Sequence, residues 1–281
     1  MAVLKYKDAN GVWQKAPGLK YMENGVSKTT VMGKYRDANG KVQRFFCIAP
    51  QSDDGDSPTT GATVAELAVG SSVFMNVGGV STEFIVVHQG RPSELYDVSC
   101  DGAWLLTKDI CEVRKWNDGK VNNNYAGSTI HTYLNGEFLN LFDAGVAGQV
   151  KEVILPYTEY SASAMFTGAN GLPTKVFLLG LYEVGGTPNY NAYYLQDGDK
   201  LDYFLLGTDD NAAKMQRRAA YNGADDVWWL RTPYKGSASG VMNVTATGDL
   251  PYKSATTAYG IRPCLILPAT ARVDDNGNVI A

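Results

Sequence analysis

Two rigid segments near the end of the chain place the strongest constraint on its fold. Residues 227–233 (VWWLRTP) and 260–263 (GIRP), the latter followed by Cys-Leu-Ile-Leu, are apolar, aromatic or arginine-bearing. Such runs predict buried strands at 227–232, 241–246 and 260–267. The 26 residues between the two segments, 234–259, are almost all small, hydroxylated or tyrosine. This polar insert has two open interpretations: exposed loops that join edge strands, or a contact surface held by a hydrophobic frame.

The rest of residues 62–268 predicts a few helices and several short strands. Thr63 and Glu66 match a capping box that opens a short helix ending at Gly70, and Gly78-Gly79 predicts a hairpin turn. The expected strands are 72–77, 80–88, 104–110, 150–155 and 176–184, and the expected helices are 128–142 and 211–221. Helices placed early and a β meander placed late predict an α+β fold rather than a doubly wound parallel sheet.

The first 48 residues contain a degenerate repeat in which a Lys-Tyr pair is followed each time by Asn-Gly. Asn-Gly supplies both residues of a type I′ turn, so residues 1–49 are predicted to form a small β module of three hairpin-like units. Residues 50–61 are polar, acidic, bounded by proline and without hydrophobic periodicity, which predicts a linker before a main domain at 62–281. The acidic residues of this linker lack the ligand spacing of a calcium loop.

Composition excludes several classes of protein. Lys and Arg number 25 against 29 Asp and Glu, for a net charge of −4, and no basic block is present, so no nucleic-acid partner is expected. The longest apolar stretch, 176–182, is far shorter than the ~20 residues of a membrane helix, and the start of the chain lacks the apolar region of a secretory signal. Four cysteines without CxxC spacing favour folding in a reducing cytoplasm.

The sequence offers little catalytic chemistry. His88 and His131 are the only histidines, and neither has a nearby partner in sequence that would complete a catalytic or metal-binding pair. Motifs for a nucleophile elbow, a zinc protease, a P-loop or a dinucleotide fold are absent from the sequence. Pairs of aspartates fall in Gly- or Asn-rich segments, where turn formation explains them. We therefore predict no catalytic residue, no metal and no cofactor.

The frame resembles one family. Residues 228–233 (WWLRTP) together with GIRP resemble the WWLRSP…GxRP arrangement at the end of bacterial and phage proteins with the C-type lectin fold, although Thr232 stands where that pattern has serine. Segments 84–92, 104–109, 128–135 and 176–179 are also similar, so the resemblance spans roughly 63–268. Within that fold, a polar insert between aromatic and GxRP anchors is similar to the variable proteins of diversity-generating retroelements, in which adenine-directed mutagenesis rewrites surface codons of a receptor binder.

This resemblance implies a C-type lectin-like domain, preceded by the β module, whose insert binds a ligand. Most insert residues are reachable from an Asn codon by changes at its adenines, whereas Lys235, Met242 and Lys253 are not. Trp228, Trp229, Leu230 and Ile261 are expected in the core, with Arg231 and Arg262 as structural hydrogen-bond donors. Val241 is assigned to the contact face by alternation about an inward Met242. The predicted contact residues are Tyr234, Lys235, Ser237, Ser239, Val241, Asn243, Thr245, Thr247, Asp249, Tyr252, Ser254, Thr256, Thr257 and Tyr259.

The implied function is that of a phage tail-associated adhesin that binds a host-surface protein or glycan, located on the virion or alternatively on a bacterial surface. Residues 1–49 resemble segments near the start of phage tail proteins, which implies attachment to other virion proteins and a homo-oligomer, with a trimer favoured. Two alternatives stay open. One is an enzyme of the formylglycine-generating type, which has the same fold and needs a cysteine pair; the other is a purely structural virion protein.

Overall fold

The computed structural model describes five strands within the first 47 residues and then residues 61–119, 122–160, 164–186, 196–207 and 209–281. The chain divides into two compact units, Met1–Pro58 and Thr59–Ala281. The division falls inside the segment that the sequence predicts as a linker. The second unit carries both the frame and the insert.

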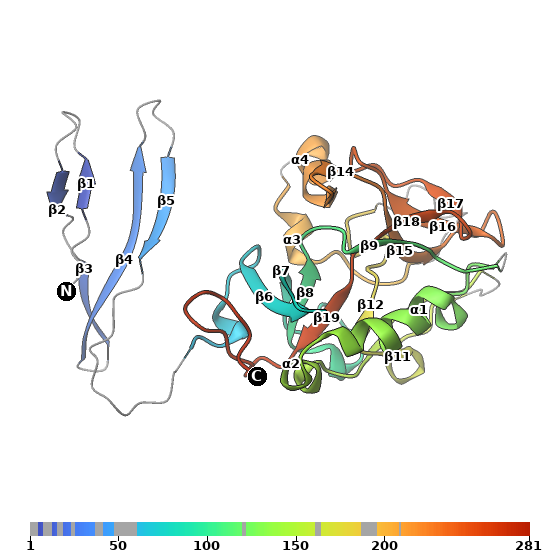
Figure 1. Ribbon diagram of the computed structural model, residues 1–281, viewed down its shortest axis with the longest axis horizontal. Helices are drawn as coiled ribbons and strands as arrows, with labels where there is room; N and C mark the ends of the chain where they lie inside the picture. Colours follow the sequence, from blue (N-terminus) through green and yellow to red (C-terminus); the bar gives the residue numbers. More distant parts are fainter. Residues whose placement is uncertain are drawn as a thin grey trace. The chain divides into compact units, whose positions relative to one another are not determined.

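The first unit consists of antiparallel strands (Figure 1). Strand β1 pairs with β2, and β4 is the middle strand of a three-stranded sheet with β3 and β5. Each antiparallel pair is separated in sequence by one Asn-Gly dipeptide, as the repeat predicts. The dipeptides themselves lie outside the described residues. The strands are β1 (Lys5–Lys7), β2 (Trp13–Lys15), β3 (Leu19–Glu23), β4 (Val26–Arg36) and β5 (Val42–Cys47).

The second unit is built on two five-stranded sheets (Figure 1). In the first, the strand order is β12-β19-β8-β7-β6. Strands β6 and β7 form the predicted hairpin, because Gly78 (φ 62°) and Gly79 (φ 83°) adopt the left-handed conformation that a type I′ turn needs. This sheet comprises β6 (Ser72–Val77), β7 (Val80–Gln89), β8 (Ala103–Thr107), β12 (Val176–Phe177) and β19 (Cys264–Leu267).

The second sheet contains the frame and part of the insert. Its order is β17-β16-β15-β18-β9, with β15 and β18 parallel and every other pair antiparallel. Strand β15 holds the first frame segment, and β16 and β17 lie within the insert. The strands are β9 (Glu112–Lys115), β15 (Trp228–Pro233), β16 (Gly240–Val244), β17 (Tyr252–Ser254) and β18 (Ala258–Ile261).

Helices and short strands join the two sheets. The predicted helix at 128–142 is present as an α-helical, a π-helical and a 3₁₀ segment in succession, capped by the Ser128 side chain, which accepts from the His131 N–H. The helices are η1 (Val64–Glu66), η2 (Val98–Cys100), η3 (Tyr125–Gly127), α1 (Thr129–Tyr133), η4 (Leu134–Phe138), η5 (Leu139–Leu141), α2 (Ala144–Gln149), η6 (Gly168–Asn170), α3 (Asp202–Leu205) and α4 (Asp210–Arg217). Two further hairpins are β10 (Val153–Leu155) with β11 (Leu172–Thr174) and β13 (Ala220–Tyr221) with β14 (Ala224–Asp225).

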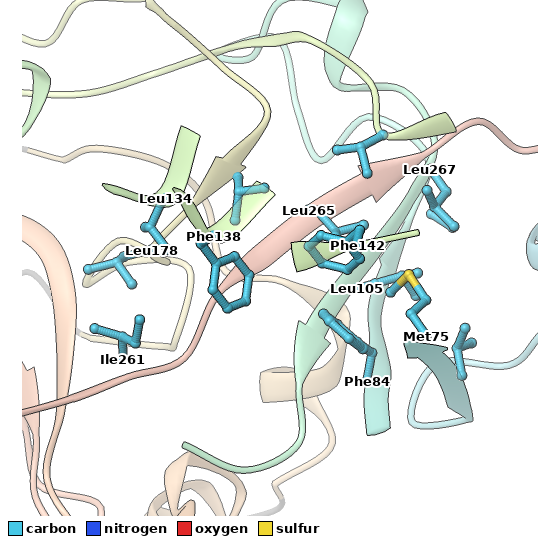
Figure 2. Packing of buried hydrophobic residues seen from close by; sticks show 14 of the residues in the cluster. Met75, Phe84, Leu105, Leu134, Phe138, Phe142, Leu178, Ile261, Leu265 and Leu267 are labelled. Atoms are coloured by element: carbon cyan, nitrogen blue, oxygen red, sulfur yellow. The ribbon is translucent and has the colours of Figure 1, made fainter. Parts of the chain in front are cut away.

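Both sheets have a hydrophobic core on each face. One core, called here the first core, contains Phe84, Leu105 and Leu265 of the first sheet together with Trp229 and Val241 of the second. Figure 2 shows its centre, where Phe138 and Phe142 from the 128–142 helix lie beside Phe84 and Leu265. The second core lies on the opposite faces of the two sheets and contains the residues that alternate with those of the first core along the same strands. Its members include Ile85, Trp104, Ile266, Trp228 and Met242.

Four sequence predictions differ from the structure. The helix expected at 211–221 ends at Arg217, and Ala220–Tyr221 form strand β13 instead. The capping box at Thr63 is present but opens only one 3₁₀ turn, η1, and not a helix that reaches Gly70. Residues 178–184 are largely buried but irregular, because their N–H groups donate to side chains and turns instead of a sheet partner. The predicted strand 260–267 is broken at Arg262-Pro263 into β18 and β19, which belong to different sheets, since proline has no N–H for a ladder.

The class is α+β, with antiparallel pairing dominant in both sheets and short helices. Among the described residues, none of the helices has both the length and the apolar character needed to cross a lipid bilayer.

Candidate ligand-binding surface

Buried side chains fix both ends of the insert. Trp228, Trp229, Leu230 and Ile261 are fully buried, as predicted. The indole N–H of Trp228 donates to the Arg217 carbonyl at 2.9 Å, and that of Trp229 donates to the Arg114 carbonyl at 3.1 Å. Strand β15 is therefore tied on its two faces to different parts of the chain.

Arg231 anchors the same strand through a buried ion pair. Its two terminal nitrogens donate to the two carboxylate oxygens of Glu183 at 2.6 and 2.7 Å, and both groups are almost fully buried. The guanidinium also donates to the carbonyls of Leu178 and Asp197 at 3.0 and 2.6 Å. Tyr96 donates its hydroxyl to Glu183 at 2.8 Å. Removing either charge would leave the other buried and unpaired, which is strongly destabilising.

Asp197 is the second carboxylate of this network. Thr232, next to Arg231, donates its hydroxyl to one oxygen of Asp197 at 2.5 Å, while the other oxygen has no hydrogen-bond partner. Burial raises the pKa of Asp197 to about 6, against the smaller lowering effect of Arg231. Asp197 is therefore a buried carboxyl group, hydrogen-bonded to the frame through Thr232, whose pKa is raised.

Main-chain contacts hold the insert in place. The side-chain amide of Asn123 donates to the carbonyls of Tyr234, Ser237 and Gly240, at 3.2, 3.0 and 2.6 Å. Further along, Ala255 N–H donates to the carbonyl of Ser239 at 2.8 Å. These bonds use insert carbonyls and N–H groups rather than insert side chains. These bonds therefore fix part of the path of the insert through its main chain.

The fourteen predicted contact residues fall into three groups. Thr247, Asp249 and Tyr252 are exposed. Val241 and Asn243 are buried, at 0 and 1% exposure, which contradicts their assignment to the contact face. The other nine are partly exposed: Tyr234, Lys235, Ser237, Ser239, Thr245, Ser254, Thr256, Thr257 and Tyr259.

The error at Val241 and Asn243 has a clear physical cause. Alternation along β16 is present, and Met242 is buried as predicted. However, Val241 points into the first core and Met242 into the second. Because β16 has β15 and β17 on its two sides and a core on each face, neither set of alternate residues reaches the surface.

Tyr234 and Tyr252 form the aromatic centre of the insert. Their rings stack with 3.7 Å between centroids and 9° between planes. A Cβ on Gly236 would lie 2.5 Å from the Tyr234 ring, and one on Gly240 would lie within 3.2 Å of both tyrosines. The two glycines therefore leave the space in which the rings stack. Tyr252 keeps 47% of its surface exposed.

Hydroxyl side chains of the insert pair mainly with one another. The hydroxyl oxygens of Thr245 and Thr247 lie 2.8 Å apart, and the Thr247 hydroxyl donates to a carboxylate oxygen of Asp249 at 2.8 Å. Ser254 and Thr256 lie 3.0 Å apart. Each of these hydroxyls can rotate to donate to, or accept from, a polar group of a bound ligand. Hydrogen bonds to a ligand can therefore replace the pairs. Asp249 also forms an ion pair with Lys214 of α4 at 2.9 Å, which lowers the pKa of Asp249.

Tyr259 belongs partly to the frame. Its ring lies 4.9 Å from that of Trp229, at an angle of 47°, and its backbone pairs with Arg114 of β9. Tyr259, predicted as a contact residue, therefore also supports the insert from beneath.

Among the described residues, no group of three His, Cys, Asp or Glu side chains could hold a metal ion. Cys100, Cys111 and Cys264 are free thiols; burial raises the pKa of Cys100 to about 12 and that of Cys264 well above its ordinary value. The side chain of Cys47 lies outside the described residues. His88 does have a partner that its sequence neighbourhood does not indicate, since its Nδ1 lies 2.9 Å from a carboxylate oxygen of Asp202.

Sequence reasoning missed three supports of this surface: Asn123, Glu183 and Arg217. Arg217 donates from Nε to the carbonyl of Gly248 at 2.8 Å and so holds the insert turn at 245–249. Only Glu183 has a signal in the sequence, as a lone carboxylate in an apolar run, which needs a buried cation. Asn123 and Arg217 lie in polar segments where nothing distinguishes them.

Comparison with known proteins gives one match. Residues 101–269 match the family described as "Domain of unknown function (DUF6273)", so the chain belongs to this family. The match covers the frame, the insert and Asn123. No curated protein and no solved structure matches the chain.

Proposed function

We propose that this member of the DUF6273 family is a binding protein whose contact surface is the insert at 234–259, without Val241 and Asn243. The observation that carries the proposal is that the contacts that fix the conformation of the insert differ from the contacts made by its exposed side chains. Its conformation rests on Asn123, on main-chain hydrogen bonds and on the buried strands, whereas its exposed side chains pair with one another.

The chemistry of the surface suits recognition of a partner. Stacked tyrosines give a rigid, amphipathic contact at low cost in conformational entropy, and nearby serine and threonine hydroxyls give adaptable hydrogen bonds. The exposed ring of Tyr252 is the expected centre of the contact. Thr247, Asp249 and Thr256 supply the polar contacts around it.

We further infer that the second unit is a C-type lectin-like domain of a retroelement-diversified protein. The order of motifs along the chain supports this assignment, as does a polar insert whose main chain is held by the side-chain amide of Asn123. The proposed setting is a phage tail or, alternatively, a bacterial surface, with a host-surface protein or glycan as the partner. The first unit is proposed to attach to other virion proteins and to associate into a trimer.

The enzyme alternative has less support. A formylglycine-generating type of reaction needs a reactive cysteine pair, whereas burial raises the pKa of Cys100 and Cys264 and so disfavours the thiolate. The structural virion alternative differs from the proposal only in its partner, and binding to cells separates the two.

The experiment that tests the proposal is binding of the labelled full-length protein to whole bacterial cells. Saturable binding is expected, with loss in the triple variant T247A/Y252A/T256A. A matched variant, Val98→Ala, changes an exposed residue outside the surface (70% exposed) and is expected to bind normally. Equal binding by both variants would overturn the proposal. Diversification is tested separately by sequencing: a near-copy of the segment encoding 227–264, differing at adenines and lying beside a reverse transcriptase gene, is expected.

A further inference from the structure

Strand β17 forms one edge of the second sheet and lies within the insert. The strand order is β17-β16-β15-β18-β9, so β17 pairs with β16 alone among the described strands. Tyr252 and Lys253 of β17 are exposed, and Ser254 is partly exposed. An edge strand of this kind presents main-chain N–H and C=O groups with which another chain can pair.

The register of β17 on β16 determines which main-chain groups face outward. Asn243 N–H of β16 donates to the Pro251 carbonyl at 2.9 Å, so these two residues form a hydrogen-bonded pair. Hydrogen-bonded and non-hydrogen-bonded pairs alternate along an antiparallel ladder. Tyr252 and Ser254 lie one and three residues beyond Pro251, so both occupy non-hydrogen-bonded positions. Their N–H and C=O groups therefore point away from β16.

Three of these four outward groups have no partner in the described part of the chain. The Ser254 carbonyl accepts from Thr257 N–H at 2.9 Å. The N–H of Ser254 and both main-chain groups of Tyr252 form no hydrogen bond with another described residue. They follow one another along the edge at the spacing of an extended strand. A second extended segment could therefore donate one hydrogen bond to this edge and accept two from it.

Lys253 gives this edge a positive charge. Its side chain is exposed, and no carboxylate of the described residues forms an ion pair with it. A lysine on an edge strand disfavours pairing with a second copy of the chain, because the copy would bring a second lysine to the paired strands. An acidic side chain on the added strand would instead form a cross-strand pair with Lys253.

We propose that β17 binds an extended, acidic segment of a partner protein, which joins the second sheet as an additional strand. This inference rests on the function proposed for the insert and narrows the partner from a protein or glycan to a polypeptide. Main-chain hydrogen bonds would supply affinity. Tyr252 and Lys253, which point to opposite faces of the strand, would select the side chains of the segment.

The test selects ligands for the full-length protein from a library of linear peptides of about 12 residues, longer than a typical strand. The selected peptides are expected to be enriched in Asp or Glu. N-methylation of each peptide residue in turn is expected to weaken binding at least about fivefold at every second position and less than about twofold between them, because only alternate N–H groups face β17. The proposal is overturned if no peptide binds or if the N-methylation effects do not alternate.

Ser254→Pro and Ser254→Ala form a matched pair of variants. Both remove the hydroxyl, but only proline removes the outward N–H, which an edge strand can lose without losing a bond to its neighbour. Ser254→Pro is expected to bind the selected peptides at least about fivefold more weakly than Ser254→Ala, the effect of one lost main-chain hydrogen bond. Equal affinities would overturn the proposal. The N-methylation scan uses the wild-type protein and therefore decides even if Ser254→Pro does not fold.

Binding to cells separates this inference from the function on which it rests. If the wild type binds cells but no peptide, the proposed function stands and strand addition is overturned. If peptides bind with the expected alternation but cells do not, strand addition stands and the proposed function fails. Self-association of the wild type that Ser254→Pro abolishes would identify a second copy as the occupant and would also overturn the proposal.

Discussion

The ring of Tyr252 stacks on that of Tyr234, with 3.7 Å between centroids, over two glycines whose missing side chains make room for the pair. Tyr252 is on β17, and Tyr234 directly follows β15, so the stack joins the first residue of the insert to a strand near its end. The pair is a rigid element on a surface that is otherwise hydroxylated. It links the fold of the insert to its proposed use.

Tyr252→Ala is expected to lower the free energy of unfolding by about 0.5–1.5 kcal/mol, the value of an aromatic pair beyond its buried area. Tyr252→Phe keeps the stack and is expected to match the wild type. Urea denaturation measures both variants. A loss in Tyr252→Phe as large as that in Tyr252→Ala would show that the hydroxyl, not the stack, stabilises the insert.

Gly248→Ala is expected to be one of the most destabilising changes in the insert. Gly248 has φ +86°, and a Cβ there would lie 2.1 Å from the Lys214 carbonyl oxygen of α4. The backbone penalty of about 1–2 kcal/mol therefore adds to a clash of about 1–3 kcal/mol. Gly223→Ala is the matched control, with φ +84° and open space around it, and should show the backbone penalty alone. Similar melting temperatures for the two variants would contradict this prediction.

Glu183→Gln is expected to destabilise the protein by about 3–5 kcal/mol, because it leaves the buried Arg231 charge unpaired. Lys115→Gln removes one partner of the exposed pair with Asp118 and should change stability by less than about 1 kcal/mol. Chemical denaturation of the two variants side by side gives the comparison. A small effect of Glu183→Gln would mean that the Arg231 charge finds another partner.

Asp197 predicts a pH dependence of stability. Its pKa is about 6 in the folded protein and 3.8 in the unfolded reference, so the folded state retains the proton over this interval while the unfolded state loses it. The wild type should therefore lose stability relative to Asp197→Asn as pH rises from about 4 to 6, by about 3 kcal/mol in total. Above pH 6 the difference should stay constant. A difference that does not change with pH would contradict the raised pKa.

The function proposed for the first unit predicts that removing this unit changes the oligomeric state of the protein. Light scattering of the full chain is expected to give a trimer, and of a chain truncated to 50–281 a monomer. Linking several weak binding sites raises avidity, which is the benefit expected for a receptor binder. A monomer in both cases would contradict the proposal. A trimer that persists after truncation would move the association surface to the second unit.

Much of the fold could be predicted from local patterns. The Gly78-Gly79 hairpin and the helix at 128–142 follow from turn chemistry and from the spacing of Ile130, Leu134 and Phe138. Strand β15 follows from the apolar run at 227–230, which continues into Arg-Thr-Pro. These elements carry their signals within a few residues, so no long-range information is needed.

The candidate surface could be predicted only in part. Alternation correctly placed Met242 inward, but it could not reveal that Val241 meets a second core, which depends on how β15 and β16 lie between distant segments. The role of Asn123 depends on carbonyls more than a hundred residues away. Such contacts are set by topology and leave no local pattern.

A scan of all substitutions at residues 227–264, with folding and cell binding measured for each variant, tests the central claim most directly. Substitutions at Trp228, Arg231 and Arg262 are expected to reduce folding. Substitutions at Thr247, Tyr252 and Thr256 are expected to reduce binding to cells while folded protein stays within about twofold of the wild type. The cost is about 0.5–1.5 kcal/mol for loss of the stack at Tyr252 and less than about 0.5 kcal/mol at the two threonines, which is small beside the stability of a typical domain. If binding falls at these three positions only in proportion to folding, the insert is not the contact surface.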